Sequence, residues 1–160
     1  MPVDAYIATL DPIHLPQLSG FWSDMMMLQQ QQSKLISLSS NARAEWEAAI
    51  ANSLDDPDVY CCVAMIETNV VGFIQASIAT GPPGLLPARF GYLSQFVLDI
   101  HSPRSLAGAG KLLVEAAQEW LKKQDIHHVR VETSSKSVVA RAFWQSLGAQ
   151  KMDDVLWMNL

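Results

Sequence analysis

Two glycines, Gly108 and Gly110, stand between the clearest strand and the clearest helix in this sequence. Residues 91–99 (GYLSQFVLD) have the composition of a strand. The helix that starts after Gly108 gathers its apolar residues on one face, at Leu112, Leu113, Ala116, Ala117, Trp120 and Leu121. Residues 128–133 then alternate between apolar and polar side chains, as a half-buried strand does. A strand, a helix and a further strand in this order are typical of an α/β domain.

The rest of the chain predicts further strands and helices. Segments 58–67 and 70–79 are rich in β-formers and are separated by Thr68-Asn69, which predicts a hairpin. The other predicted elements are a strand at 5–10, a helix from 15 to 26 that the glutamines at 29–32 end or extend, a helix from Asn41 to 54, a helix at 138–147 stopped by Gly148, and a final strand at 152–160. The order βααβββαβαβ predicts one α/β (α+β) domain over residues 1–160, with a mixed, mostly antiparallel central sheet and four flanking helices.

The composition indicates a globular chain without a basic surface. Its 160 residues are 49% apolar and carry a net charge of −5, which argues against nucleic acid as a partner and is compatible with a cationic small molecule. The sequence has no apolar run long enough for a membrane helix. Residues 1–10 also lack a basic stretch followed by an apolar one. We therefore expect a cytoplasmic protein with no membrane partner.

The residues that commonly bind metals are not clustered in the sequence. Cys61 and Cys62 are adjacent in a predicted strand, so their side chains point to opposite faces, and we expect two reduced thiols. His127 and His128 begin another strand in the same alternating way. We expect no bound metal.

The Gly-Ala-Gly sequence before the helix is suited to binding an anion. Glycines let backbone N–H groups converge and let a phosphate approach without meeting a Cβ, and a helix N-terminus adds unpaired N–H groups and partial positive charge. The glycines are too close together for a P-loop, and Leu113 occupies the place of the third glycine of the dinucleotide-binding fingerprint. The alternative is a turn that serves packing alone.

The same segment resembles a motif of the GNAT superfamily of acyl-CoA-dependent N-acyltransferases. In that family the fourth strand is followed by Gln/Arg-x-x-Gly-x-Gly/Ala, and matching the glycines puts Ser105 at the Gln/Arg position, with Arg104 one residue early. Residues 137–144 and 148–149 are similar to the family's later Asn-x-x-Ala-x-x-aromatic-Tyr and Gly-Phe patterns. Because the order of elements also resembles the family along the whole chain, we expect the GNAT fold.

The resemblance implies an acetyl-CoA site beside the fourth strand. The pyrophosphate would bind the N–H groups of the glycine segment, the pantetheine arm would follow the fourth strand where it splays from the fifth, and the last helix would face the thiol. A bulky residue at Gly108 or Gly110 would then obstruct CoA and leave the fold largely intact. The implied CoA-binding residues are Val97, Leu98, Arg104, Ser105, Leu106, Ala107, Gly108, Ala109, Gly110, Lys111, Leu112, Ser137, Ala140 and Trp144.

The groups that would move protons depart from the family's pattern. Many members use a Tyr as the acid, but this sequence has Trp144 there, and an indole N–H does not release its proton near neutral pH. Many members have a carboxylate on the fourth strand as the base, whereas the polar residues here are Ser94 and Gln95, with Asp99 at the strand end. The catalytic residues therefore stay open, with Ser94, Gln95, Asp99 and Trp144 as weak candidates and His101 as a further titratable group.

The leading hypothesis is an N-acetyltransferase that passes an acetyl group, or another acyl group, from acetyl-CoA directly to an amine in a ternary complex. The acceptor would be a small-molecule amine or a peptide amine. The alternatives are a non-catalytic acyl-CoA-binding or regulatory protein of the same fold and an unrelated α/β binding module. The resemblance implies an acceptor pocket lined by Trp22, Met25, Met26, Trp46 and Trp157, and homodimers are common in the family.

Overall fold

A five-stranded sheet forms the centre of the molecule. The computed structural model describes residues 4–102 and 108–160. The strands lie side by side in the order β1 (Tyr6–Thr9), β2 (Val59–Ile66), β3 (Asn69–Thr80), β4 (Arg89–Leu98) and β5 (Val129–Val131). Neighbouring strands are antiparallel except β4 and β5, which are parallel. The predicted mixed, mostly antiparallel sheet is confirmed.

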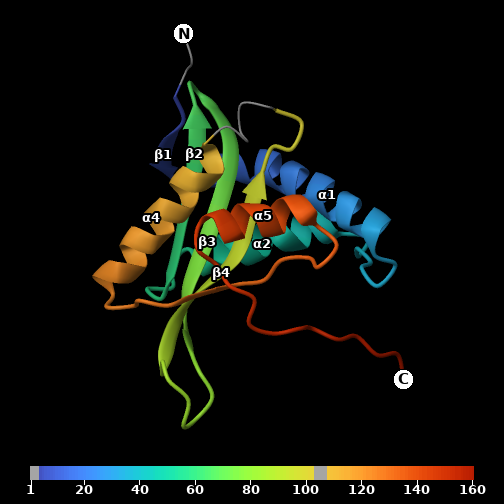
Figure 1. The fold of residues 1–160 in the computed structure, drawn as a ribbon. Coiled ribbons are helices and arrows are strands. Elements are labelled where there is room, and N and C mark those ends of the chain that lie inside the picture. The colour runs from blue at the N-terminus through green and yellow to red at the C-terminus, as the bar shows by residue number, and fades with distance from the viewer. Residues whose placement is uncertain (1–3, 103–107) are drawn as a thin grey trace.

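Helices cover both faces of this sheet (Figure 1). They are the short 3-10 helix η1 (Pro12–His14) and the longer helices α1 (Leu15–Gln32), α2 (Ala42–Ser53), α4 (Ala109–Lys123) and α5 (Val138–Ser146). One buried cluster joins α4 and α5 to the sheet through Leu113, Ala117 and Trp144. A second cluster joins α1 and α2 to the other face through Leu18 and Trp46. The four longer helices confirm the predicted four flanking helices.

Both faces of β2 are buried, which explains its almost continuous apolar sequence. Cys62 and Ala64 belong to the cluster under α4, whereas Val63 and Met65 belong to the cluster under α1 and α2. Cys61 packs beside the second cluster, so the adjacent cysteines lie on opposite faces as predicted, and both are free thiols.

The residues at the helix ends differ in whether they cap the helix. The Asp11 side chain accepts a hydrogen bond from the Ile13 N–H at 3.0 Å and starts η1. Asn41 occupies the N-cap position of α2, but its side chain makes no capping hydrogen bond. Gly148 has a φ of 92° just after α5, the left-handed conformation that commonly ends a helix at glycine.

The predicted final strand at 152–160 is wrong. Residues 150–160 form neither a helix nor a strand, and all of them are exposed. A strand exists only where its backbone finds a partner, and the hydrogen bonds of the described chain include none from this backbone to another residue. The apolar alternation of the segment is real, but alternation alone does not supply that partner.

Candidate functional site

The edge of β4 that faces β5 is open over half of its length. β5 pairs only with residues 91–93 of β4, so within the described chain residues 94–98 have no strand beside them on that side. Helix α4 begins close to this open edge, because Gly110 near its start approaches the side chains of Phe96 and Leu98. Figure 1 shows α5 lying in front of the same region of the sheet. The predicted splaying of the fourth and fifth strands is therefore present.

A bulge in β4 marks the point where the edge opens. Gln75 of β3 faces Gln95, and its neighbour Ala76 faces Leu93, which leaves Ser94 as the extra residue. A bulge bends the strand and re-aims its side chains. This bulge is the feature of the site that periodicity in the sequence did not indicate.

The two polar side chains at the bulge connect β4 to its neighbours. Ser94 Oγ donates a hydrogen bond to Gln75 Oε1 at 2.9 Å, and Gln75 Nε2 donates to Ser53 Oγ of α2 at 2.7 Å. Gln95 Oε1 accepts a hydrogen bond from Trp46 Nε1 at 3.0 Å. Through these hydrogen bonds the Ser94 hydroxyl and the Gln95 amide hold the strand in position. Neither group is basic enough to take a proton from an amine.

The described residues leave the N-terminus of α4 uncovered. Gly108 is its N-cap residue with a φ of 122°, and a Cβ built there would meet nothing within 4 Å among the described atoms. No described side chain caps the helix. The exposed Lys111 in the first turn pairs with Glu115 at 3.7 Å. The implied binding residues Arg104, Ser105, Leu106 and Ala107 lie outside the described residues.

Gly110 does not share the open position of Gly108. It is buried, and a Cβ there would lie 3.1 Å from Phe96 Cζ and 3.4 Å from both Leu98 Cδ1 and Phe143 Cζ. Gly110 therefore lets α4 approach the aromatic side chains of β4 and α5. The expectation that a bulky residue at Gly110 would leave the fold largely intact is inconsistent with this packing.

We expect Gly110→Val to lower the free energy of unfolding by about 1–3 kcal/mol, because it overpacks the contact with Phe96. Urea denaturation measures this loss. Gly20→Val is the matched control, since Gly20 is also helical but its Cβ would meet only the Arg43 side chain, at 3.5 Å or more. A Gly110→Val protein as stable as Gly20→Val would contradict the packing role of Gly110.

Two of the implied CoA-binding residues, Ser137 and Trp144, make contacts that stabilise helix α5 and its packing on the sheet. Ser137 is the N-cap, and its Oγ accepts a hydrogen bond from the Ala140 N–H at 3.2 Å. Trp144 is 7% exposed, with its ring centroid 5.2 Å from that of Phe96 and 5.0 Å from that of Phe143. Trp144 thus packs over β4 at the open edge.

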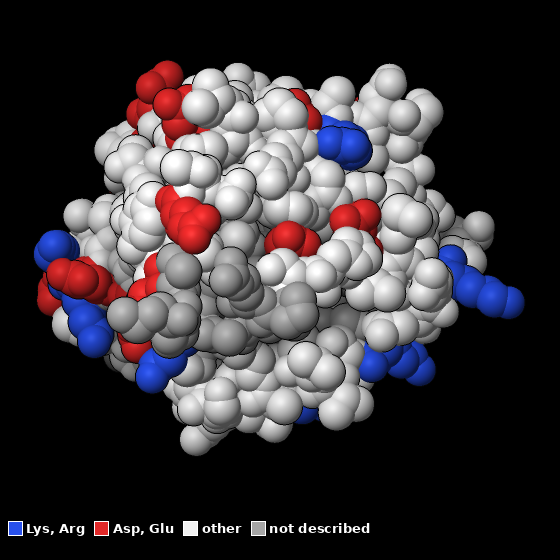
Figure 2. Space-filling view, turned by 90° about the horizontal axis from the view of Figure 1, so that it is seen from above, with Lys and Arg blue, Asp and Glu red and all other residues white. Residues whose placement is uncertain are grey.

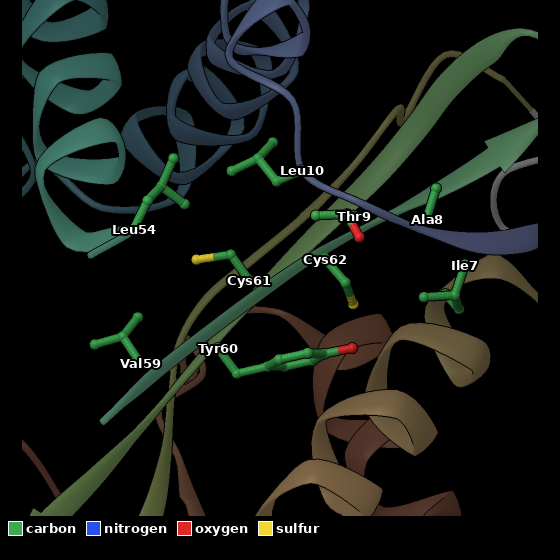
Figure 3. A pocket seen from close by; sticks show the side chains of 9 residues that line it. All are labelled: Ile7, Ala8, Thr9, Leu10, Leu54, Val59, Tyr60, Cys61 and Cys62. Atoms are coloured by element: carbon green, nitrogen blue, oxygen red, sulfur yellow. The ribbon is translucent and has the colours of Figure 1, made fainter. Parts of the chain in front are cut away.

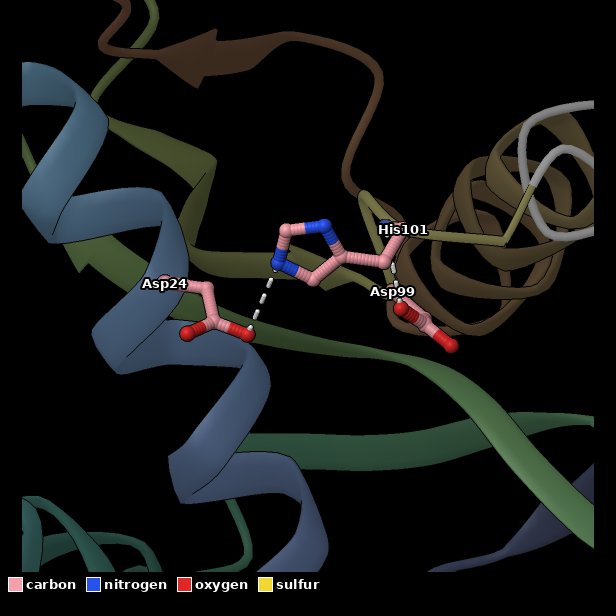
Figure 4. Close-up of polar contacts among 3 residues, drawn as sticks. All are labelled: Asp24, Asp99 and His101. Carbon is pink, nitrogen blue, oxygen red and sulfur yellow. Dashed lines mark hydrogen bonds and ion pairs between the residues drawn. The ribbon is translucent and has the colours of Figure 1, made fainter.

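Three polar residues meet near the end of β4 (Figure 4). Asp99 Oδ1 accepts a hydrogen bond from the His101 N–H at 3.1 Å, and the Asp99 N–H donates to Val71 O at 2.9 Å. Asp99 therefore holds the turn that follows the strand. His101 Nε2 lies 3.4 Å from Asp24 Oδ2, which connects this turn to α1.

A shallow pocket of about 370 Å³ lies between the middle of α1, residues 37–39 and the start of α2. Its aromatic wall is formed by Trp22 and Trp46, stacked with ring centroids 5.8 Å apart. Glu45 lines it too, and its Oε2 accepts a hydrogen bond from Ser39 Oγ at 2.7 Å. The remaining lining residues are Ser37, Leu38 and Ala42.

The other implied acceptor residues are not in that pocket lining. Met25 packs beside the cluster under α1 and α2. Trp157 lies in the exposed C-terminal segment, where its Nε1 donates to Asn159 Oδ1 at 3.2 Å. Of the five, Trp22 and Trp46 line that pocket, and Met25 packs against the same buried cluster.

A second cavity, of about 470 Å³, lies between β1, β2 and the end of α2 (Figure 3). Tyr60, Cys61 and Cys62 line it. Burial raises the pKa of the Cys61 thiol and raises that of Cys62 to about 11, and burial likewise raises the pKa of the Tyr60 phenol. These groups stay protonated near neutral pH, so they provide no thiolate nucleophile there.

No group of three or more His, Cys, Asp or Glu side chains among the described residues is arranged to hold a metal ion. None of the described helices combines the length and apolar character needed to cross a membrane.

Solved structures of acetyltransferases share this fold. A predicted acetyltransferase with acetyl-CoA from Clostridium acetobutylicum is 15% identical, with a TM-score of 0.75 over 98% of this chain and 96% of that one. Aminoglycoside 6′-N-acetyltransferase AAC(6′)-IG from Acinetobacter haemolyticus is 17% identical, with a TM-score of 0.73 over 97% of each chain. AAC(6′)-Iy in complex with the bisubstrate analogue CoA-S-monomethyl-acetylneamine is 20% identical, with a TM-score of 0.68 over 98% of each chain.

Sequence comparison identifies the family directly. No curated protein sequence matches this chain. The model of the acetyltransferase (GNAT) family matches residues 22–149, a range that includes the α4 N-terminus, the open edge of β4 and helix α5. The chain belongs to the GNAT family of acetyltransferases.

Proposed function

We propose that this protein is a cytoplasmic N-acetyltransferase that transfers the acetyl group of acetyl-CoA directly to the amine of a small molecule. The observation that carries the proposal is the open edge of β4 beside the open N-terminus of α4. One extended ligand with an anionic group at one end suits both features together. Residues 94–98 offer backbone groups along an edge, and the helix end offers N–H groups and partial positive charge.

Acetyl-CoA fits these two features. Its pyrophosphate would bind the first N–H groups of α4, where no described atom obstructs the approach to Gly108 and Lys111 adds positive charge. Its pantetheine arm carries amide groups that would pair with the backbone of β4 from Ser94 towards Leu98. The thioester would then lie near the bulge at Ser94, next to the aromatic side chains of Phe96 and Trp144.

The acceptor site would be the pocket lined by Trp22, Trp46 and Glu45. Trp46 connects that pocket to the bulge, because its indole donates to Gln95. Aromatic faces and a carboxylate favour a cationic amine. Figure 2 shows the molecule from above the view of Figure 1, with carboxylates near the middle of this face and most Lys and Arg side chains towards its outline. The aminoglycoside acetyltransferases among the structural relatives support a small-molecule acceptor of this kind.

The reaction needs a neutral amine and a place for its proton. The amine nitrogen attacks the thioester carbonyl, the C–S bond breaks, and one proton moves from the amine while the CoA thiolate gains one. Ser94, Gln95 and Trp144 are neutral groups that shape the site and do not exchange protons near pH 7. We therefore propose that proton transfer passes through water, and that the protein contributes mainly by positioning the two substrates.

We expect acetyl-CoA to raise the melting temperature. A ligand at 100 times its Kd stabilises the folded state by about 2.7 kcal/mol, which corresponds to a shift of roughly 5–10 °C in a chain of this size. Differential scanning fluorimetry with acetyl-CoA, CoA, NAD and ATP measures the shift. Equal shifts with all four ligands, or none with acetyl-CoA, would refute the proposed binding site.

Two lysines on α4 give a matched control for the place of binding. Lys111 pairs with Glu115 at the start of α4, and Lys123 pairs with Glu119 at its end, each four residues apart and exposed. Replacing either lysine with alanine removes a similar ion pair. Only Lys111→Ala is expected to weaken acetyl-CoA binding, by roughly 2–5-fold, since a single exposed charge contributes about 0.3–1 kcal/mol.

The second candidate function is acyl-CoA binding without catalysis. It is favoured by the neutral bulge residues Ser94 and Gln95 and by Trp144 at the family's Tyr position. Release of free CoA thiol from acetyl-CoA, measured with a panel of small amines, separates the two functions. Thermal stabilisation by acetyl-CoA without amine-dependent thiol release would identify the non-catalytic protein.

A further inference from the structure

A carboxylate, Glu132, lies at the point where β5 leaves β4. The two parallel strands pair from Gly91 to Leu93 of β4, and the last pair joins Leu93 to Val131. Ser94 and Glu132 are therefore the first residues beyond that pair, and neighbouring strands lie about 4.8 Å apart where they pair. The Glu132 side chain is 55% exposed, so water reaches it. Glu132 thus stands beside the bulge, where the thioester is proposed to lie.

Glu132 lies on the face of the sheet that α1 and α2 cover. Val131 packs against the buried cluster under α4 and α5. Because side chains alternate along a strand, its neighbours Arg130 and Glu132 point to the opposite face. Trp46 lies on that opposite face, in the cluster under α1 and α2. The Glu132 carboxylate and the proposed acceptor pocket therefore share one face of the sheet.

The phenol of Tyr92 holds the Glu132 carboxylate in this place. Tyr92 pairs with Arg130 in the sheet, and its hydroxyl forms a hydrogen bond with the Glu132 side chain. Burial raises the pKa of the Tyr92 phenol, and the charge of Glu132 and this hydrogen bond raise it further, so the phenol is the donor near neutral pH. Arg130 Nη2 lies 3.6 Å from Glu132 Oε1. A carboxylate accepts several hydrogen bonds, so Glu132 can also accept one from a water.

Two other carboxylates of the proposed site have different positions. Asp99 holds the turn after β4, and it lies five residues beyond Ser94, which is roughly 16 Å along a strand. Glu45 lines the acceptor pocket and accepts a hydrogen bond from Ser39. Of the three carboxylates, Glu132 is the one that stands beside the bulge.

We propose that Glu132 is the catalytic base of the acetyl transfer and that Tyr92 is its positioning residue, an inference that rests on the proposed function. As the amine attacks the thioester carbonyl and the C–N bond forms, the nitrogen becomes acidic and gives one proton, through a water, to the Glu132 carboxylate. The C–S bond breaks, and its electron pair stays on sulfur. The thiolate takes a proton from water, and the Glu132 carboxyl returns its own proton to the hydroxide left behind.

The test measures amine-dependent release of CoA thiol by the full-length protein, with the fastest acceptor from a panel of small amines that includes benzylamine and neamine. For Glu132→Gln we expect kcat to fall by about 10²–10⁴-fold, the usual contribution of a general base. The KM for the amine and the thermal stabilisation by acetyl-CoA are expected to stay at their wild-type values. Glu119→Gln is the matched control with wild-type kcat, because Glu119 is also exposed and pairs with a cation, Lys123, at 3.4 Å.

Tyr92→Phe tests the positioning role, because it removes the hydroxyl and keeps the ring. We expect kcat to fall by roughly 2–10-fold, as the loss of one hydrogen bond predicts. In the Glu132→Gln background the same change is expected to lower kcat no further, since the effects of two residues that act through one another are not additive. Equal losses in both backgrounds would show that Tyr92 does not act through Glu132.

The outcomes separate this inference from the proposed function. A Glu132→Gln protein with wild-type kcat, or one in which only the KM for the amine rises, overturns the inference and leaves the acetyltransferase function intact. A wild type that acetyl-CoA stabilises but that releases no thiol with any amine of the panel refutes the proposed function, and the catalytic role of Glu132 with it.

Discussion

Trp46→Ala is expected to lower the free energy of unfolding by about 3–5 kcal/mol, the usual cost of truncating a buried Trp. Trp46 is only 6% exposed. Its ring stacks on Trp22 and meets the edge of Phe73, both with centroids 5.8 Å away, and its N–H donates to Gln95. One side chain thus joins α1, α2, β3 and the bulge of β4, so its loss leaves a cavity and an amide without its donor. Urea denaturation measures the effect, with Leu86→Ala at an exposed position as the control.

Trp46→Phe separates the packing of this side chain from its hydrogen bond to Gln95. It retains most of the apolar contact and removes the hydrogen bond to Gln95 Oε1, for which we expect a loss of about 1–2 kcal/mol. If the hydrogen bond between Trp46 and Gln95 holds the bulge in the shape that the reaction needs, kcat falls in this variant while the affinity for acetyl-CoA is unchanged. A stability loss below about 1 kcal/mol for Trp46→Ala would show that the aromatic cluster does not hold these elements together.

The stability of the protein is expected to fall steeply above pH 9 because Cys62 is buried. Burial raises the pKa of this thiol from 9.0 to about 11, although its hydrogen bond with Tyr60 acts in the opposite direction. The unfolded chain therefore releases this proton at lower pH than the folded protein does. The stabilisation is complete below pH 9.0 and is lost as the pH rises through about 11. A shift of this size corresponds to about 2–3 kcal/mol.

Cys62→Ala removes this titration and, with it, the contribution of Cys62 to the raised pKa of the Tyr60 phenol. Near neutral pH the variant is expected to be less stable than the wild type, because Cys62 is only 2% exposed and its loss leaves a small cavity. The difference in the free energy of unfolding between the two proteins should shrink by about 2 kcal/mol when urea denaturation is repeated near pH 11. Cys61→Ala is the control at the adjacent thiol, whose pKa is raised less. If the wild type and the Cys62→Ala protein lose stability in parallel between pH 9 and 11, the loss does not come from ionisation of the Cys62 thiol.

The sequence alone determined the elements that depend on local pattern. The helical period from Leu112 to Leu121 predicted α4, the β-formers around Thr68 predicted the hairpin, and Gly148 correctly ended α5. The opposite faces of Cys61 and Cys62 followed from the two-residue repeat of a strand. These properties depend on residues close together in the chain, which is why a single sequence reveals them. The order of the elements also followed from these patterns, and the structure confirms it as far as helix α5 but not for the final strand. The family resemblance is confirmed by the family match over residues 22–149.

Only the tertiary structure decided what depends on distant partners. Gly108 and Gly110 are alike in sequence, yet Gly108 is open and Gly110 packs against Phe96, because the direction of each Cα–H depends on how α4 lies on the sheet. The bulge at Ser94 arises from pairing with β3, and the bond from Trp46 to Gln95 joins residues 49 positions apart. The C-terminal segment 150–160 shows the same dependence on a distant partner. Its apolar alternation predicts a strand, but whether a strand forms depends on a partner edge that no local pattern supplies.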